Sequence, residues 1–210
     1  MDLDAIRIAY LRDGHATVAR AVGGTTVAAA LEHLASMQAS RRVPTAVVTA
    51  PIDGEPFFVS ITNHARLTAI ASTLVGAPVR AFGCSYVVKV PRRGLPAFWH
   101  QDGHPWQVNL GIRDAVTLWL ALDHANPRNG CLRVIPGSHR RPAQPLRPRP
   151  DEPSIFGVEL DPALVDAGRA VAVVLAPGDV SAHHPALVHG SEANLSDSPR
   201  RALALRYRAA

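Results

Sequence analysis

Residues 79–90 read VRAFGCSYVVKV, a run rich in β-branched and aromatic residues. Similar runs follow at 114–125 (DAVTLWLALDHA), 131–137 (CLRVIPG), 170–181 (AVAVVLAPGDVS) and 201–208 (RALALRYR), between Gly, Pro, Asn and Asp residues. Such runs are typical of short strands. Because no helical pattern separates them, the strands are expected to pair antiparallel, which predicts a sandwich or jelly roll over residues 79–208.

The first 78 residues have a different pattern, in which helices dominate. We expect helices over 4–12, over 27–38 after a Thr25-Thr26 cap, and over 65–75 between Asn63 and Gly76. Short strands are expected at 15–22, 45–50 (TAVVTA) and 57–62 (FFVSIT). The predicted fold class is therefore α+β, mainly β, with an N-terminal helical layer packed on one sheet of a jelly roll.

Length and composition favour one domain over residues 1–210, since 210 residues with 47% hydrophobic content can form one sizeable core. The formal charge of +5 permits binding of anions, but the arginines are spread along the chain without interleaved aromatics, so nucleic acid is not expected as a partner. The two cysteines lack the spacing of a metal site or disulfide scaffold. No signal peptide or membrane-spanning run is recognised, so we expect a cytoplasmic protein.

A segment rich in proline and arginine occupies residues 140–153, RRPAQPLRPRPDEP. Its five prolines forbid a helix, and its polar residues cannot fill a core. The sequence that follows is too short to fold alone, so a linker between two domains is the weaker interpretation. We expect a surface loop, or a lid, inserted between two strands.

Residues 99–106, WHQDGHPW, concentrate chemically capable side chains in a chain with only 5% aromatic residues. In an extended segment His100 and Asp102 project to the same side. A further histidine from SAHHPALVHGS (181–191) would complete two histidines and one carboxylate, the arrangement that holds non-haem Fe(II) with open positions. An isolated H-x-D is a weak signal, and the second segment offers three candidate histidines, His183, His184 and His189.

The ordered motifs WHQDGHPW, LWLALDHANPRNGCLRVIPGSH and APGDVSAHHPALVHGSEANLSDSPRRALALRY resemble the phytanoyl-CoA dioxygenase family over residues 80–208. The resemblance implies a double-stranded β-helix of cupin type that uses Fe(II), 2-oxoglutarate as co-substrate and O2. It further implies hydroxylation of an unactivated C–H bond of a small-molecule substrate, with release of succinate and CO2. Natural-product intermediates, amino-acid-like compounds and acyl compounds are the substrate classes that it suggests.

The family's site residues can be carried over to this sequence one at a time. The resemblance implies that His100, Asp102 and His189 are the metal ligands. It implies that Arg200, eleven residues after His189, binds the distal carboxylate of 2-oxoglutarate, a task that suits a guanidinium. Ser191 would add a hydrogen bond to that carboxylate, and Trp119 would lie near the co-substrate. Independently of the resemblance, Lys89 lies on the strand before the H-x-D and is a candidate to bind an anionic group. A solvated lysine on an edge strand is the alternative for Lys89, and a core tryptophan is the alternative for Trp119.

Aromatic side chains beside the implied metal site suggest a wall for the substrate. We therefore expect Trp106, His104 and Trp99 to contact it, with plain packing of the two tryptophans as the alternative. The carboxylate at Asp102 argues against halogenation, since halogenating relatives carry a smaller residue there. Two other classes remain open, namely a cupin-type metal enzyme that does not use 2-oxoglutarate and a non-catalytic jelly roll that binds a small molecule.

Overall fold

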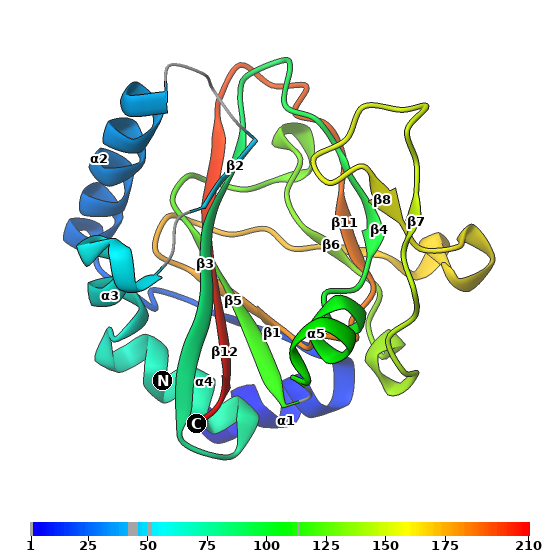
Figure 1. Ribbon diagram of the computed structural model, residues 1–210, viewed down its shortest axis with the longest axis horizontal. Coiled ribbons are helices and arrows are strands. Elements are labelled where there is room, and N and C mark those ends of the chain that lie inside the picture. Colours follow the sequence, from blue (N-terminus) through cyan, green and yellow to red (C-terminus); the bar gives the residue numbers. More distant parts are fainter. Residues whose placement is uncertain (1, 42–45, 50–51, 113) are drawn as a thin grey trace.

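Two antiparallel sheets form the centre of the molecule in the computed structural model, which describes residues 2–41, 46–49, 52–112 and 114–210 (Figure 1). The larger sheet has the strand order β1-β10-β5-β12-β3-β2 and the smaller sheet has the order β4-β11-β6-β9. The larger sheet comprises β1 (His15–Val18), β2 (Val47–Thr49), β3 (Val79–Lys89), β5 (Ala115–Ala121), β10 (Val180–His183) and β12 (Arg200–Ala209). The smaller sheet comprises β4 (Ala97–His100), β6 (Arg133–Val134), β9 (Val171–Ala172) and β11 (His189–Ser191). The predicted jelly roll is thereby confirmed.

Helices cover the outer face of the larger sheet (Figure 1). They are α1 (Leu3–Asp13), α2 (Gly24–Arg41), α3 (Pro56–Thr62) and α4 (Ala65–Val75), while α5 (Gly103–Leu110) follows β4. Single 3-10 turns lie at η1 (Ile52–Gly54), η2 (Pro127–Asn129), η3 (Ser138–Arg140), η4 (Pro162–Leu164) and η5 (Ala167–Arg169). A small hairpin of β7 (Arg147–Pro148) and β8 (Val158–Glu159) lies beside β4. The helical layer is therefore where the sequence predicted it.

Strand β12 divides the interior into two compartments because its side chains alternate between the two faces of the sheet. Leu203 and Leu205 face the helices and are fully buried in the larger hydrophobic cluster. Ala202 and Ala204 face the smaller sheet and belong to a second cluster, with Trp119. The alanines are small, so they leave space between the two sheets, and this space is where the candidate site lies.

Several predicted boundaries hold in the N-terminal layer. Helix α1 ends at Gly14, which adopts a left-handed conformation with φ of 75°, and α4 ends at Gly76 in the same way with φ of 81°. The strand expected over 45–50 is present as β2, although residues 45 and 50 lie outside the described part of the chain. Strand β1 stops at Val18, earlier than predicted.

The expected strand over residues 57–62 is wrong, because this segment forms helix α3. Pro56 is its first residue, a position that proline favours since the missing N–H is not needed there. Phe58, Ile61 and Thr62 are the buried residues, a helical spacing that the run of apolar letters conceals. Similarly, α2 begins at Gly24, so Thr25 and Thr26 lie in its first turn and do not precede it.

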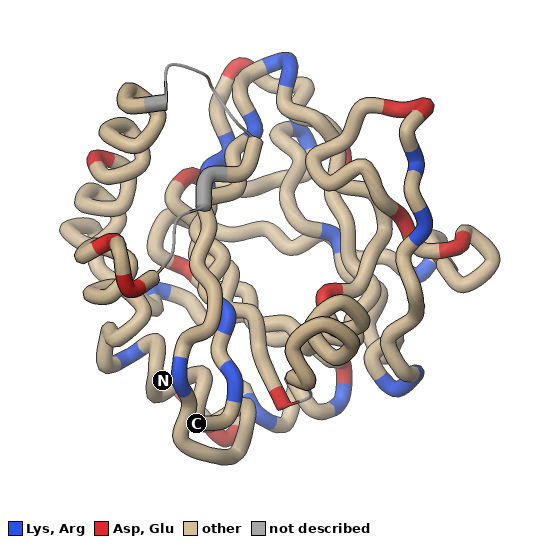
Figure 2. Tube along the Cα trace, in the orientation of Figure 1, with Lys and Arg blue, Asp and Glu red and all other residues tan. Residues whose placement is uncertain are grey.

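Charged residues are distributed over helices, strands and loops, as Figure 2 shows along the whole trace. No helix among the described residues is long and apolar enough to cross a membrane.

Candidate metal and co-substrate site

Two histidines come together because strands β4 and β11 pair in antiparallel register. His100 ends β4, His189 begins β11, and the two residues are direct partners. Directly opposed residues of an antiparallel pair point to the same face. Both side chains are buried, with ring centroids 4.1 Å apart. Residues 89 positions apart in the sequence therefore present imidazoles to one point between the two sheets.

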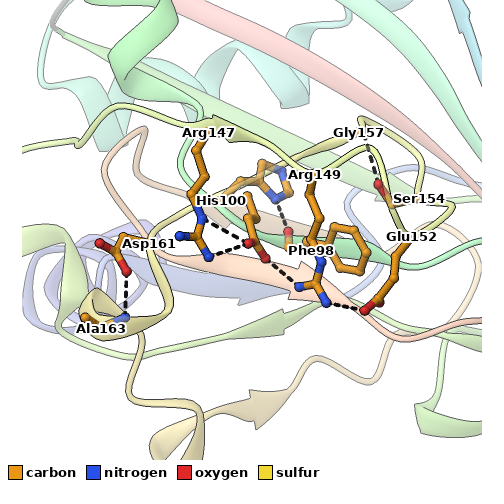
Figure 3. A network of polar contacts seen from close by, with 10 residues as sticks. Phe98, His100, Arg147, Arg149, Glu152, Ser154, Gly157, Asp161 and Ala163 are labelled. Carbon is orange, nitrogen blue, oxygen red and sulfur yellow. Dashed lines mark hydrogen bonds and ion pairs between the residues drawn. The ribbon is translucent and has the colours of Figure 1, made fainter.

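The orientation of each imidazole is fixed by its own backbone. His100 Nδ1 lies 2.7 Å from the carbonyl oxygen of Phe98, a contact drawn in Figure 3, and His189 Nδ1 lies 2.9 Å from that of Leu187. A carbonyl only accepts, so Nδ1 carries the proton and Nε2 keeps its lone pair. Burial, followed by the charge of a neighbouring histidine, lowers the pKa of both imidazoles to about 4. Both rings are neutral at pH 7, the form that binds metals.

Asp102 supplies the third candidate ligand from the turn that follows β4. Its backbone is helical, with φ of −73° and ψ of −28°, and it is the N-cap residue of α5, so the expected extended geometry stops before it. Thr117 Oγ1 donates a hydrogen bond of 3.1 Å to Asp102 Oδ2, while Oδ1 lies 4.0 Å from His189 Nε2. The ligand atoms of His100, Asp102 and His189 all lie within 4.8 Å of one another. The structure therefore groups the three residues that the sequence singled out.

The charge state of Asp102 also suits a cation. Burial raises the pKa of this carboxyl, but His183 and the other nearby imidazoles lower it more, so the pKa lies below its usual range. Asp102 is therefore an anion at neutral pH. An anionic carboxylate beside two neutral imidazoles is the donor set of a non-haem Fe(II) site.

The two other histidines of the 181–191 segment have different environments. His183 is buried on β10, its Nε2 lies 3.7 Å from Asp102 Oδ2, and its ring centroid lies 4.7 Å from that of His189. His184 points out of the barrel, where its ring lies 5.3 Å from that of His139. Its Nδ1 accepts a hydrogen bond from the Ala186 amide. His183 is thus a neighbour of Asp102, and His184 takes no part in the group.

A buried arginine lies in the same cavity as the three candidate ligands. Arg200 is 2% exposed, and its guanidinium lies over the Trp119 ring at 5.2 Å. Its Nε has no hydrogen-bond partner among the described residues, and its Nη1 reaches the Val87 carbonyl at 3.4 Å. Burial lowers the pKa of Arg200 to about 10, so it is still charged at pH 7. A buried cation with free donors is costly unless an anion binds to it, and a carboxylate matches its fork.

Ser191 and Trp119 line this cavity, but Lys89 does not. Lys89 is fully buried on β3, between β12 and β2, so the alternative of a solvated edge-strand lysine is wrong. Its Nζ donates hydrogen bonds to the carbonyls of Ser191 and Glu192. Burial, and then the charge of Arg200, lower the pKa of Lys89 to about 6.

Trp99, His104 and Trp106 lie outside the lining of the cavity. Trp99 alternates with His100 and so points to the other face of β4, where it packs with a small apolar cluster. His104 and Trp106 lie on helix α5, since the chain turns at Asp102. Trp106 packs edge-on against Phe82 at 5.1 Å.

Among the polar and aromatic residues of the lining, sequence reasoning missed Thr117, Phe156 and Arg206, and it named His183 only as an alternative to His189. Thr117 has the same strand parity as Trp119, and Arg206 has that of Arg200, so alternation offered a signal for both. Phe156 carried no such signal. It lies in the β7–β8 loop, and its ring is 5.2 Å from that of His100.

The proline- and arginine-rich segment contacts residues that lie close to the candidate metal ligands in the sequence. Arg147 and Arg149 form ion pairs with Glu159, and Arg149 also lies over the Phe98 ring at 4.2 Å (Figure 3). Near the start of the segment, the backbone N–H of Gln144 donates a hydrogen bond to Gln101 Oε1. The hairpin is thereby attached to β4 and to the residue between His100 and Asp102.

Comparison with known proteins finds relatives by sequence and by structure. Ectoine dioxygenase of Sphingopyxis alaskensis is 29% identical over 166 residues, which are 73% of this chain and 54% of that protein. The chain thus spans about half the length of that relative.

Two solved structures of similar fold contain bound ligands. The epimerase SnoN, in complex with Fe3+, α-ketoglutarate and nogalamycin RO, is 25% identical with a TM-score of 0.79, over 99% of this chain and 84% of that chain. EvdO2 from Micromonospora carbonacea var. aurantiaca, complexed with 2-oxoglutarate, is 26% identical with a TM-score of 0.80, over 98% of this chain and 90% of that chain. The family model of phytanoyl-CoA dioxygenase (PhyH) matches residues 12–202. This chain therefore belongs to the phytanoyl-CoA dioxygenase family.

Proposed function

We propose that the protein is an Fe(II)- and 2-oxoglutarate-dependent oxygenase that hydroxylates an unactivated C–H bond of a small molecule, with O2 consumed and succinate and CO2 released. The observation that carries the proposal is the group of two buried histidines, His100 and His189, and the half-buried Asp102, whose ligand atoms lie within 4.8 Å of one another. Family membership and the ligands bound to SnoN and EvdO2 support the same chemistry.

The donor set fits iron, with both Nε2 lone pairs and the Asp102 Oδ1 directed to one point. His100, Asp102 and His189 would hold the metal on one side and leave the opposite side open. When bound, the metal and 2-oxoglutarate supply the oxidising chemistry that attacks the C–H bond. The protein itself positions the reactants and excludes water.

Arg200 would bind the distal carboxylate of 2-oxoglutarate, because its buried guanidinium has free donors and no carboxylate partner among the described residues. Ser191 would add a hydrogen bond, and Trp119 would hold the guanidinium in place. Lys89 would act indirectly, since its Nζ already donates to the carbonyl of Ser191.

The substrate would enter beside Phe156 and Ile155, which line the cavity near His100. The lining does not support substrate contacts from Trp99, His104 or Trp106. Because the SnoN structure contains nogalamycin RO, we propose a natural-product intermediate as the substrate class. We also propose that the protein acts in the cytoplasm.

An anaerobic titration of metal-free protein with Fe(II) and then 2-oxoglutarate tests the proposal. We expect the visible charge-transfer band of a chelated keto acid in wild type and in His184→Ala, and no band in His189→Ala. His184→Ala is a matched control, because His184 points out of the barrel. Absence of the band in wild type would contradict the proposed function and favour a metal enzyme that does not use 2-oxoglutarate.

A further inference from the structure

A second arginine lines the cavity at the opposite end from Arg200. Side chains at 200, 202, 204 and 206 of β12 face the smaller sheet, and Arg200, Ala204 and Arg206 all line the cavity. The two arginine Cα atoms are six residue steps apart along the strand, a distance of roughly 20 Å. Ala202 and Ala204, which lie between the two arginines on this face, are short, and Arg200 and Arg206 both line the cavity. The cavity thus has a cation at each end.

Cross-strand pairing places Arg206 on the metal side. Thr117 is the direct partner of His183 on β10 and of Arg206 on β12, and Arg206 is in turn the partner of Gly83 on β3. Opposed residues share a face, so these side chains form one row across the sheet. Thr117 in this row donates to Asp102. Arg206 therefore lies in the row of residues next to Asp102.

Two neighbours on β3 shape the position of this guanidinium. A Cβ at Gly83 would lie 3.3 Å from Arg206 Cδ, so the absence of a side chain there leaves room for the arginine. Ser85 Oγ accepts a hydrogen bond of 3.0 Å from Arg206 Nη1. This bond orients the guanidinium and uses only one of its five N–H groups.

Arg206 has no carboxylate partner among the described residues, in contrast to Arg201, which forms an ion pair with Asp123 at 2.7 Å. Asp102 is the sole acidic residue among those that line the cavity, and it belongs to the candidate metal group. A half-buried cation that faces a cavity without a counter-ion favours an anionic ligand.

We infer that Arg206 determines substrate specificity and that the substrate carries a carboxylate, which the free edge of this guanidinium binds. The inference rests on the proposed function, since it assigns Arg200 to 2-oxoglutarate. With a divalent metal and a dianionic co-substrate bound, Asp102 and the two arginines leave one net positive charge. A monoanion balances this charge, and a single guanidinium fork matches a carboxylate.

Fluorine NMR of the Co(II)-loaded protein with 2-oxoglutarate, kept anaerobic, tests the inference with two probes of equal shape. The probes are 4-fluorophenylacetate and its neutral amide, 4-fluorophenylacetamide, and paramagnetic broadening reports binding near the metal. Wild type should bind the acid about tenfold more tightly than the amide, and Arg206→Gln should lose this preference. Arg206→Lys should retain part of it, because the charge remains and the fork is lost. Arg201→Gln, on the opposite face of β12, is the matched control and should behave as wild type.

A parallel titration keeps the two proposals distinguishable. In Arg206→Gln, the Fe(II) and 2-oxoglutarate band should form with an affinity within about twofold of wild type, which also shows that the variant is folded. Loss of the band in wild type would count against the proposed function alone. No binding of the acid to wild type, equal binding of acid and amide, or unchanged binding in Arg206→Gln would overturn the role of Arg206. Tighter binding of 4-fluorophenyl phosphate than of the acid would overturn the assignment to a carboxylate.

Discussion

The hydrogen bond from Thr117 to Asp102 gives a quantitative prediction for metal affinity. Thr117→Val keeps the shape of the side chain and removes the donor that lies 3.1 Å from Asp102 Oδ2. The carboxylate then loses the bond that holds Oδ2 aside while Oδ1 faces the candidate metal position. Hydrogen bonds to charged groups contribute about 1.5–3 kcal/mol, and loss of a residue that orients a metal ligand weakens metal binding about 10- to 100-fold.

The structure indicates the lower part of that range. The bond length is ordinary, and the Asp102 side chain is 18% exposed, so water can replace the lost donor in part. We therefore expect Co(II) affinity to fall by about 10- to 30-fold in Thr117→Val. The assay is a competition titration of the metal-free protein against a chelator of known affinity, followed by the visible absorption of bound Co(II).

Ser181→Ala provides the matched control. Ser181 is fully buried on the neighbouring strand, and its Oγ has no hydrogen-bond partner in the part of the chain that the structure describes. Removing it takes away a buried hydroxyl without touching Asp102, so affinity should stay within about twofold of wild type. The reasoning is refuted if Thr117→Val loses less than about threefold, or if Ser181→Ala loses as much. Thermal unfolding of both metal-free variants checks that neither effect reflects a damaged fold.

Two further variants, and one control, test the residues around the site. Gly130→Ala places a Cβ 2.4 Å from the Glu192 carbonyl at a φ of 73°, so we expect urea denaturation to give a free energy of unfolding lower by about 3 kcal/mol or more. Gly111→Ala, with φ of 66° and nothing within 4 Å, should cost only about 1 kcal/mol, and equal losses would refute the steric argument. Phe156→Ala should change stability by less than about 0.5 kcal/mol, since the side chain is 43% exposed. It should nevertheless speed the release of Co(II) to excess chelator about threefold by uncovering His100, and an unchanged rate would show that the ring does not shield the metal.

The strands of the core were predictable because alternation and turn residues carry their signal locally. All five of the runs from residue 79 onward contain strands, including β3, β5 and β12. The grouping of His100 with His189 came from a family resemblance, since pairing across 89 positions leaves no local trace. The segment 57–62 failed because six apolar or small residues fit a strand as well as a buried helix, and only Pro56 indicated the helix.

The substrate residues were harder to predict because they depend on where an extended segment ends. His104 and Trp106 are expected beside the site because they follow His100 and Asp102 closely in the sequence, whereas the chain enters α5 at Gly103. His104 and Trp106 therefore lie outside the lining, and an aromatic side chain of the lining is Phe156, from the β7–β8 loop. Alternation gives the facing of Thr117 and Arg206, but the register between β5 and β12 is needed to place the two residues side by side.

The strand that specifies the fold also positions the chemistry of the site. On β12, Leu203, Leu205 and Tyr207 are fully buried against the helices, and burial of each such side chain contributes about 1.5–3 kcal/mol. A slip of one residue would move these side chains into the cavity and turn Arg200 and Arg206 toward the helical layer. The apolar face therefore fixes the register, and the register holds two cations that face the cavity and have no acidic partner among the described residues. The desolvation cost of Arg200 is offset by its neighbours on the same strand, which is how a buried charge can be kept ready for a carboxylate ligand.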